Sequence, residues 1–147
     1  MSREIKFRVW DKTTDTMFTG SDLIIDTGSK MVTIDDNPID YENDVEAVLM
    51  QYTGLKDKND KEIYEGDVLS GGNEYDKRYG TPVIKIGNYE ECKELFDEDG
   101  DFYELSCTGV YFEFNDNTCT GIDYTCISNF EVIGNIYENP ELLEEKQ

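Results

Sequence analysis

The sequence predicts a mainly β protein with little helix, built as two small β units of which the second is an SH3-like partial barrel. Residues 5–10 alternate apolar side chains with other side chains at the period of two that is typical of a strand. Short apolar runs are separated by Asp, Asn, Gly and Thr, which favour turns. Aromatic residues make up 12% of the chain, and this content indicates a folded core rather than disorder.

The first half of the chain is expected to form two hairpins followed by a polar loop. Pro38 interrupts residues 35–44, where it should block regular structure because it lacks a backbone donor. The nearly continuous apolar run at residues 45–52 fits either a strand or a short helix, because its periodicity favours neither. The expected hairpin strands are residues 5–10 with 16–18, and residues 23–25 with 31–34.

The second half is expected to begin with a tight turn at residues 65–69 that leads into the partial barrel. Residues 71–80 are rich in Gly and predict a flexible loop. Asn88 with Glu91 three residues later predicts a short helix over residues 88–96. The other expected elements are strands within residues 83–86, 102–114, 124–127 and 130–136, and a helical turn that starts at Asn139 and Pro140.

These elements predict a division of the chain into three regions. Residues 1–62 form the N-terminal hairpin unit, residues 63–137 the SH3-like unit, and residues 138–147 a terminal helical turn and tail. A chain of 147 residues is long enough for one domain or for two small β units. No apolar run approaches the roughly 20 residues that span a bilayer, so a cytoplasmic protein without membrane contact is expected.

The charge balance is strongly acidic, with 34 Asp and Glu against 13 Lys and Arg and a net charge of −21. Residues 94–145 contain no Lys or Arg. Because nucleic-acid binding needs bases to replace counterions, direct binding to nucleic acid is not expected. Two hypotheses remain for the acids, a solvated surface that maintains solubility and an imitation of a phosphate backbone. The residues of the imitating surface would be Asp97, Glu98, Asp99, Asp101 and Glu104.

The absence of His excludes Ser–His–Asp and Cys–His nucleophile pairs and every zinc site that uses imidazole. The four Cys residues are widely spaced and contain no C-x-x-C pair, so they predict reduced, buried thiols rather than a metal site. No glycine pattern for binding phosphates is present. The sequence therefore predicts no catalytic residue, no cofactor and no metal.

One segment favours an enzyme. Asp26 begins Asp-Thr-Gly-Ser after two apolar residues, as in aspartic proteases, and an apolar-apolar-Gly segment follows at residues 132–134. Such proteases need two aspartates that share one proton. The alternative is that Asp, Thr, Gly and Ser simply form a hairpin turn.

Three aromatic residues are candidates for an interaction surface. Trp10, Tyr52 and Tyr64 lie on segments that cannot all face one core. They are either core and rim residues or anchors of a subunit or partner interface.

Three segments carry a resemblance to a known family. IKFRVWDK at residues 5–12, MQYTGLKDKNDKEIYEGDVL at residues 50–69 and FEVIGNIYENPELL at residues 130–143 resemble the YopX family of phage and prophage proteins. This chain departs from the family at Val9, where Ala is more frequent, and at Asp60, where Gly is common. The resemblance implies a small β-rich protein of a bacterial host cytoplasm, and it carries over no catalytic residue.

The expected function is that of a phage or prophage accessory protein that is not an enzyme. It would act through protein–protein contacts, as a homo-oligomer and with a host protein as a further partner. The first alternative is an acidic DNA mimic that inhibits a host nucleic-acid-binding or defence protein. The second is an aspartic protease that uses Asp26.

Overall fold

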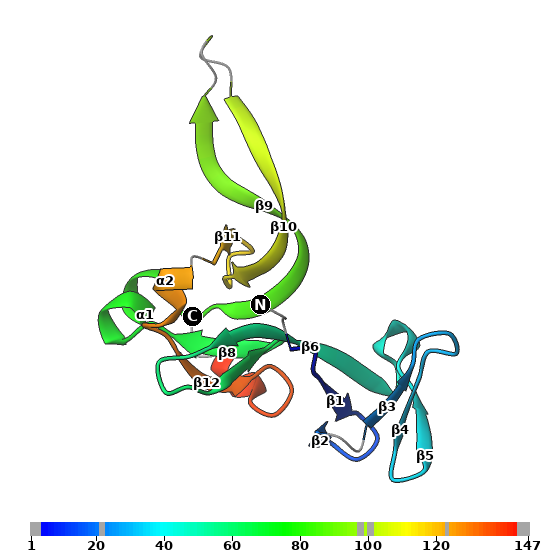
Figure 1. Cartoon of the computed structure of the whole chain (residues 1–147). Coiled ribbons are helices and arrows are strands. Elements are labelled where there is room, and N and C mark those ends of the chain that lie inside the picture. The colour runs from blue at the N-terminus through cyan, green and yellow to red at the C-terminus, as the bar shows by residue number, and fades with distance from the viewer. Residues whose placement is uncertain (1–3, 21–22, 97–98, 100–101, 123, 144–147) are drawn as a thin grey trace. The chain divides into compact units, whose positions relative to one another are not determined.

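The computed structural model describes residues 4–20, 23–96, 99, 102–122 and 124–143, with the backbone alone at residues 91–96, 102–105 and 124 (Figure 1). The described chain is mainly strand with little helix, which confirms the predicted fold class. It divides into two compact units, Met1–Gly54 and Leu55–Gln147. The sequence places this boundary after residue 62. No helix of the described residues is long and apolar enough to cross a membrane.

The first unit contains two small sheets around one core. Strand β1 pairs antiparallel with β2 on one side and β6 on the other, so that Val9 lies opposite Phe18 and Leu49. A separate three-stranded sheet has the order β3-β4-β5. The strands are β1 (Phe7–Asp11), β2 (Thr16–Thr19), β3 (Leu23–Asp26), β4 (Met31–Ile34), β5 (Asn37–Asp40) and β6 (Ala47–Lys56), and the 3-10 turn η1 (Glu42–Asp44) precedes β6.

The core of the first unit takes side chains from both sheets. Val9 and Ala47 come from β1 and β6, and Val32 and Ile34 come from β4. All four are buried, because alternate residues of each strand point to the inner face. The period-two pattern at the N-terminus predicted the strand β1 correctly, but not its burial, because Trp10 and Asp11 are buried as well as Val9.

The second unit is a curled half-barrel sheet with the order β10-β11-β9-β8-β12. Strand β6 runs from the first unit into the second and neighbours β7. The strands are β7 (Glu62–Tyr64), β8 (Asp67–Ser70), β9 (Val83–Phe96), β10 (Phe102–Glu113), β11 (Cys119–Gly121) and β12 (Glu131–Asn135). Three short helical segments complete the unit, α1 (Asn73–Tyr79), α2 (Tyr124–Ile127) and η2 (Pro140–Leu143).

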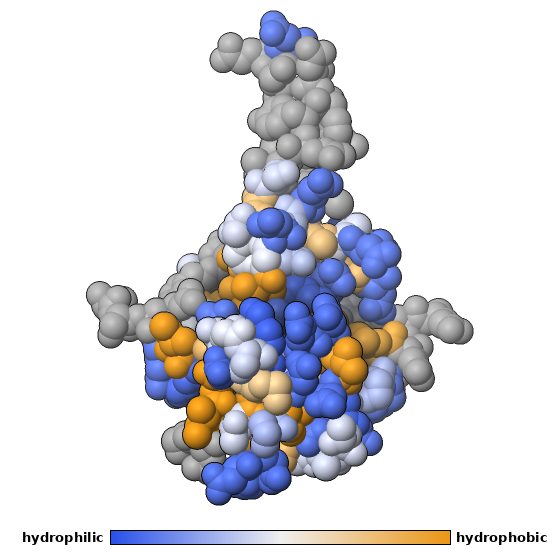
Figure 2. All heavy atoms as spheres, turned by 90° about the vertical axis from the view of Figure 1, so that its right-hand side faces the viewer, coloured by the Kyte–Doolittle hydropathy of each residue, from blue (hydrophilic) through white to orange (hydrophobic). Residues whose placement is uncertain are grey.

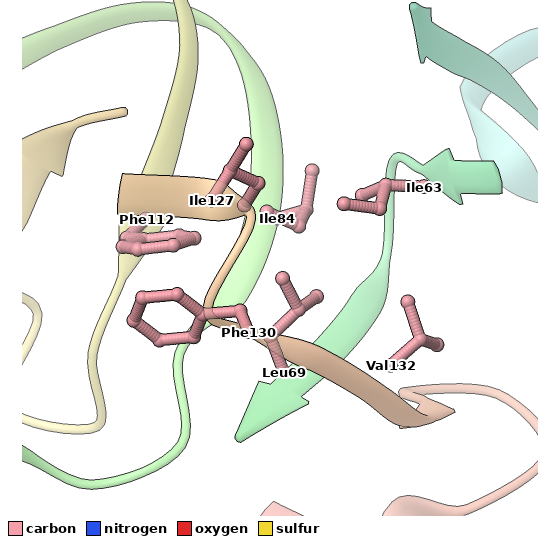
Figure 3. Packing of buried hydrophobic residues seen from close by; sticks show 7 residues of the cluster. All are labelled: Ile63, Leu69, Ile84, Phe112, Ile127, Phe130 and Val132. Carbon is pink, nitrogen blue, oxygen red and sulfur yellow. The ribbon is translucent and has the colours of Figure 1, made fainter. Parts of the chain in front are cut away.

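The half-barrel closes around a core of aliphatic and aromatic side chains (Figure 3). Phe112 and Phe130 pack with ring centroids 5.0 Å apart, and Ile127 of α2 lies beside them. Burying such side chains contributes about 1.5–3 kcal/mol each relative to leaving them in water. The members are Ile63, Leu69, Ile84, Phe112, Ile127, Phe130 and Val132.

The hairpin of β9 and β10 continues well beyond this core (Figure 1). Its described core residues, Ile84 and Phe112, lie near the base of the hairpin. Gly87 and Gly109 face each other in the register, with φ of 148° and 147°. Residues with side chains rarely adopt this conformation, so the paired glycines mark the place where the hairpin leaves the barrel.

Four predictions of local structure are wrong. Residues 88–96 belong to strand β9 instead of a helix, and residues 124–127 form α2 instead of a strand. Residues 71–80, predicted as a loop, contain α1, and Pro38 lies within β5. Pro38 is tolerated because β5 is an edge strand, where one row of N–H groups needs no partner strand. The other three errors have one cause, since pairing and packing with distant segments override weak local preferences.

Four further predictions of local structure are settled by the structure. The ambiguous run at residues 45–52 lies largely in strand β6, and the predicted C-terminal helical turn is present as η2. Both predicted N-terminal hairpins are also present, as the pairs β1–β2 and β3–β4.

Candidate interaction surface

The buried carboxylate of Asp57 holds a loop to a distant strand. Its Oδ1 accepts hydrogen bonds from the backbone N–H groups of Asn59 at 2.8 Å and Lys61 at 2.9 Å. Its Oδ2 accepts one from the N–H of Val132 at 2.9 Å. Burial alone would raise the pKa of Asp57, but these backbone donors and the Lys61 charge outweigh it and lower the pKa below its ordinary value. The side chain is therefore an ionised structural tie.

Three other buried polar side chains have the same role at turns. The Oδ2 of Asp67 accepts a hydrogen bond from the Tyr64 N–H at 2.8 Å, across the turn that contains Gly66. The Oδ1 of Asn135 accepts hydrogen bonds from the two residues that begin the next turn. Asp11 accepts hydrogen bonds from Thr13 and Thr14 after β1. These acceptors serve the chain's own turns, and the described residues contain no group of three or more ligands placed to hold a metal.

A different kind of surface occurs on helix α1. Lys77, Arg78 and Tyr79 are consecutive and exposed at its C-terminal end, and we call these three residues the α1 surface. Tyr79 leaves 52% of its area exposed. The Arg78 guanidinium lies over the Tyr79 ring, with its Cζ 5.1 Å from the centroid. This arrangement combines a cation–π contact with a large exposed aromatic ring.

Tyr79 is supported from the core by a chain of rings. Its ring lies 4.9 Å from that of Tyr75, and the Tyr75 ring meets Phe130 edge-on at 5.0 Å. Phe130 is a member of the half-barrel core. Burial raises the pKa of Tyr75. The exposed Tyr79 ring is therefore held by packing against Tyr75, which itself packs against the core.

The start of α1 is also held firmly. The Asp76 Oδ1 accepts a hydrogen bond from the Gly71 N–H at 2.9 Å, and its Oδ2 accepts one from the Ser70 hydroxyl. A Cβ on Gly71 would lie 2.7 Å from the Tyr75 ring, so glycine is needed at this position. The sequence contained a signal for this helix, with acids in its first turn, Lys77 and Arg78 in its last turn, and glycines on either side. The segment was nevertheless predicted as a loop, so the α1 surface was not among the predicted sites.

The aromatic residues predicted as interface anchors lie mostly inside the molecule. Trp10 is 8% exposed and Tyr52 is 5% exposed, so neither ring is presented to a partner on this surface. Their burial agrees with the alternative that they are core residues rather than interface anchors. Tyr64 is half-buried and donates its hydroxyl to Glu62 at 3.0 Å.

The predicted acidic mimic surface lies mainly outside the described residues. Asp97, Glu98 and Asp101 are outside them, and Glu104 is described by its backbone alone. Asp99 is exposed. Elsewhere hydrophilic residues predominate on the face shown in Figure 2, with apolar residues in limited patches.

Asp26, the predicted protease residue, lies at the exposed turn between β3 and β4. Its Oδ1 accepts hydrogen bonds from the N–H groups of Gly28 at 2.9 Å and Ser29 at 3.2 Å. The Ser29 hydroxyl and these N–H groups lower the pKa of Asp26. A carboxylate used in this way stabilises a hairpin turn, which is the alternative that its sequence context offered.

The cysteines differ from their predicted burial. Cys126 is exposed, and Cys107 and Cys119 are partly exposed. All three are free thiols. The side chain of Cys92 lies outside the described part of the chain.

Comparison with known proteins establishes the family. The family model described as YopX protein matches residues 6–144. The chain belongs to the YopX family. The resemblance carried by three short segments is thereby confirmed, and the family match also includes residues 70–129, which lie between the second and third of these segments.

Two crystal structures are similar to this YopX-family chain. Protein EF1440 from Enterococcus faecalis is 28% identical with a TM-score of 0.58, and the match covers 97% of this chain and 99% of that one. The YopX protein from Bacillus subtilis is 21% identical with a TM-score of 0.49, covering 97% and 98%. No curated protein matches the chain.

The segments that resemble the family contain the side chains that tie the turns. Asp11, Asp57, Asp67 and Asn135 all lie within them. Asp60, where the family commonly has Gly, has φ of 67°, in the left-handed region that glycine adopts without strain. The segments that carry the resemblance therefore contain side chains that hold the turns of this fold.

Proposed function

We propose that this YopX-family protein is a phage or prophage accessory protein that is not an enzyme. It acts in the bacterial cytoplasm through protein–protein contacts, and it self-associates. The observation that carries the proposal is the α1 surface, where Arg78 and Tyr79 are exposed on a support that reaches the core.

The chemistry of this surface suits a protein contact. Tyr and Arg are among the residues that contribute most to binding at protein interfaces. A ring already fixed by Tyr75 loses little conformational freedom on binding, so more of its contact energy remains as affinity. Lys77 adds a second cation beside it.

A non-catalytic role is supported by the amino-acid composition and by the hydrogen bonds that the buried aspartates make. Histidine is absent, and buried Asp11, Asp57 and Asp67 hold turns through their own hydrogen bonds. Carboxylates that already accept hydrogen bonds from their own turns are less available as general bases.

Light scattering coupled to size exclusion tests the self-association. The molar mass should exceed that of one chain at tens of micromolar and fall on dilution. Tyr79→Ala should shift the assembly toward the monomer, whereas Ile133→Ala removes an apolar side chain that is 39% exposed at another place and serves as the control. A wild-type protein that remains monomeric at these concentrations contradicts self-association.

The second candidate is an acidic mimic of DNA that inhibits a host nucleic-acid-binding or defence protein. The observation in its favour is the base-free stretch of residues 94–145, which holds fourteen Asp and Glu. A pull-down from host lysate should recover a DNA-binding protein, and the complex should weaken steeply with salt. Recovery of no such protein would remove this candidate.

A further inference from the structure

We infer that the α1 surface of one copy binds described exposed acids of the second unit on a second copy. This inference rests on the proposed self-association and specifies its geometry. Within residues 94–145 these acids are Asp99, Asp116, Glu138 and Glu141.

The cations of the second unit differ in whether they pair with acids of their own chain. In the second unit, Lys56 and Lys58 already pair with acids of their own chain, Asp60 at 3.8 Å and Glu131 at 3.4 Å. Lys77 and Arg78 form no ion pair with any described residue. Two adjacent exposed cations in a chain with a net charge of −21 are thus available to an acidic partner.

The positive charge of the α1 surface is complementary to the acids of the same chain. The same chain supplies an acidic partner, because residues 94–145 contain fourteen Asp and Glu and no base to neutralise them. A contact that places like charges together is strongly disfavoured, so most pairs of surfaces on two copies repel each other. The α1 surface presents two adjacent exposed cations, so it can meet an acidic surface without this repulsion.

The two contacting surfaces differ, so the contact is heterologous. Each copy would present its α1 surface to one neighbour and its acids to another. Such contacts generate closed rings, or open chains where the rotation does not close. Assembly beyond a dimer is therefore expected as the concentration rises.

Added salt should affect the association of copies in two opposite ways. At low ionic strength the Debye length is about 30 Å at 0.01 M, so the net charges of whole copies repel each other. Near 0.15 M it is about 8 Å, so that repulsion is screened while close contacts survive. At about 1 M even the close ion pairs are weakened. Association should accordingly pass through a maximum near physiological salt, whereas a purely apolar interface should strengthen steadily with salt.

The decisive variant is Arg78→Glu, compared with Lys30→Glu. Lys30 is exposed on the β3–β4 turn, and the two substitutions change the net charge equally. Sedimentation velocity at about 0.15 M salt should show the dissociation constant rise about tenfold or more in Arg78→Glu. Lys30→Glu should leave it near the wild-type value. Circular dichroism confirms that both variants are folded, and Arg78→Gln repeats the test without an acid in the last turn of α1.

A direct measurement does not depend on any substitution. A carbodiimide joins the Lys77 amine to a carboxylate that lies against it. In a mixture of isotope-labelled and unlabelled protein, mass spectrometry should find Lys77 joined to an exposed acid of the second unit in mixed-label pairs. Lys30 should not give such mixed pairs.

The outcomes separate this inference from the proposed function. If wild type never associates at any salt concentration, both fail. If it associates and Arg78→Glu assembles as well as Lys30→Glu does, or if mixed-label links to Lys77 are absent, the α1 contact is overturned while self-association stands. A single-stranded oligonucleotide provides one more test. If it binds wild type but not Arg78→Glu, and if adding it does not dissociate the wild-type assembly, then the α1 surface binds nucleic acid and the inference is also overturned.

Discussion

At the scale of single residues, the chain uses buried acids as structural ties. Asp57 illustrates this best, because its carboxylate connects a loop to Val132 of strand β12, which is 75 residues away in the sequence. A buried acceptor with three backbone donors leaves them unsatisfied when it is removed. Such residues carry information about the fold, although their chemistry is often associated with catalysis.

Asp57→Ala should therefore be among the most destabilising substitutions of a polar residue. We expect the free energy of unfolding to fall by about 2–3 kcal/mol, since the buried N–H of Val132 loses its acceptor. Glu74→Ala, which removes an exposed carboxylate from α1, should change it by less than about 0.5 kcal/mol. Urea unfolding measures both, and equal effects would contradict the role assigned to Asp57.

The lowered pKa of Asp57 also predicts acid sensitivity. Because the folded pKa lies below the unfolded value of about 3.9, the stabilisation is complete above that value and is lost as the pH falls through the folded pKa. The free energy of unfolding should decline more steeply below about pH 4 in wild type than in Asp57→Asn. Parallel curves from denaturant titrations at several pH values would show that the carboxylate is not linked to folding.

At the scale of elements, the β9–β10 hairpin consists of a part that contributes to the half-barrel core and an extension beyond it. The described core members of both strands lie on the barrel side of Gly87 and Gly109. The extension interacts with the body at few described places, including the stacked rings of Tyr89 and Tyr111 at 4.6 Å and the pairing of Glu91 with Cys119. The extension should thus contribute little to folding.

Removing residues 88–108 tests this directly. The deletion joins Gly87 to Gly109 and leaves Ile86 opposite Val110, so Gly-Gly becomes a two-residue hairpin turn of a favoured kind. We expect a folded protein that loses about 1 kcal/mol with the Tyr89–Tyr111 stack. Deleting residues 87–108 leaves a single glycine as the connection and should be clearly worse. Thermal unfolding by circular dichroism compares the two, and an unfolded first variant would place the extension within the folding core.

The same hairpin shows why part of the local structure was predicted wrongly. Asn88 and Glu91 have the spacing of a helix cap, and nothing nearby in sequence opposes a helix. The register with residues 102–108 decides for a strand, and that pairing involves segments that the sequence does not align. Residues 5–10 were correctly predicted to contain a strand, because they alternate at a period of two, but their burial does not follow that alternation: Ile5 is exposed, whereas Arg8 and Trp10 are both buried.

At the scale of the whole molecule, the chain has two separate cores. Val9, Val32, Ile34 and Ala47 form one core, and the residues around Phe112 and Phe130 form the other. Each core lies within one compact unit. Units with their own cores can unfold at different temperatures, so a single transition is not required.

The fluorescence of Trp10 can show whether the two units unfold at different temperatures. Trp10 is the only tryptophan, and it is buried in the first unit, so its fluorescence reports on that unit alone. Circular dichroism reports on strands of both units. We expect the two melting curves to have different midpoints. Coincident curves, with equal calorimetric and van't Hoff enthalpies, would show that the units unfold as one.

The sequence by itself determined the β class, the N-terminal hairpins, the acidic charge and the family, because these depend on periodicity, composition and short motifs. Only the tertiary structure decided that Trp10 and Tyr52 are buried, that residues 88–96 are a strand, and that Arg78 and Tyr79 are presented together on a supported helix. The physical reason is that burial and pairing depend on which distant segments meet. A local pattern states a preference, and packing against the rest of the chain selects the outcome.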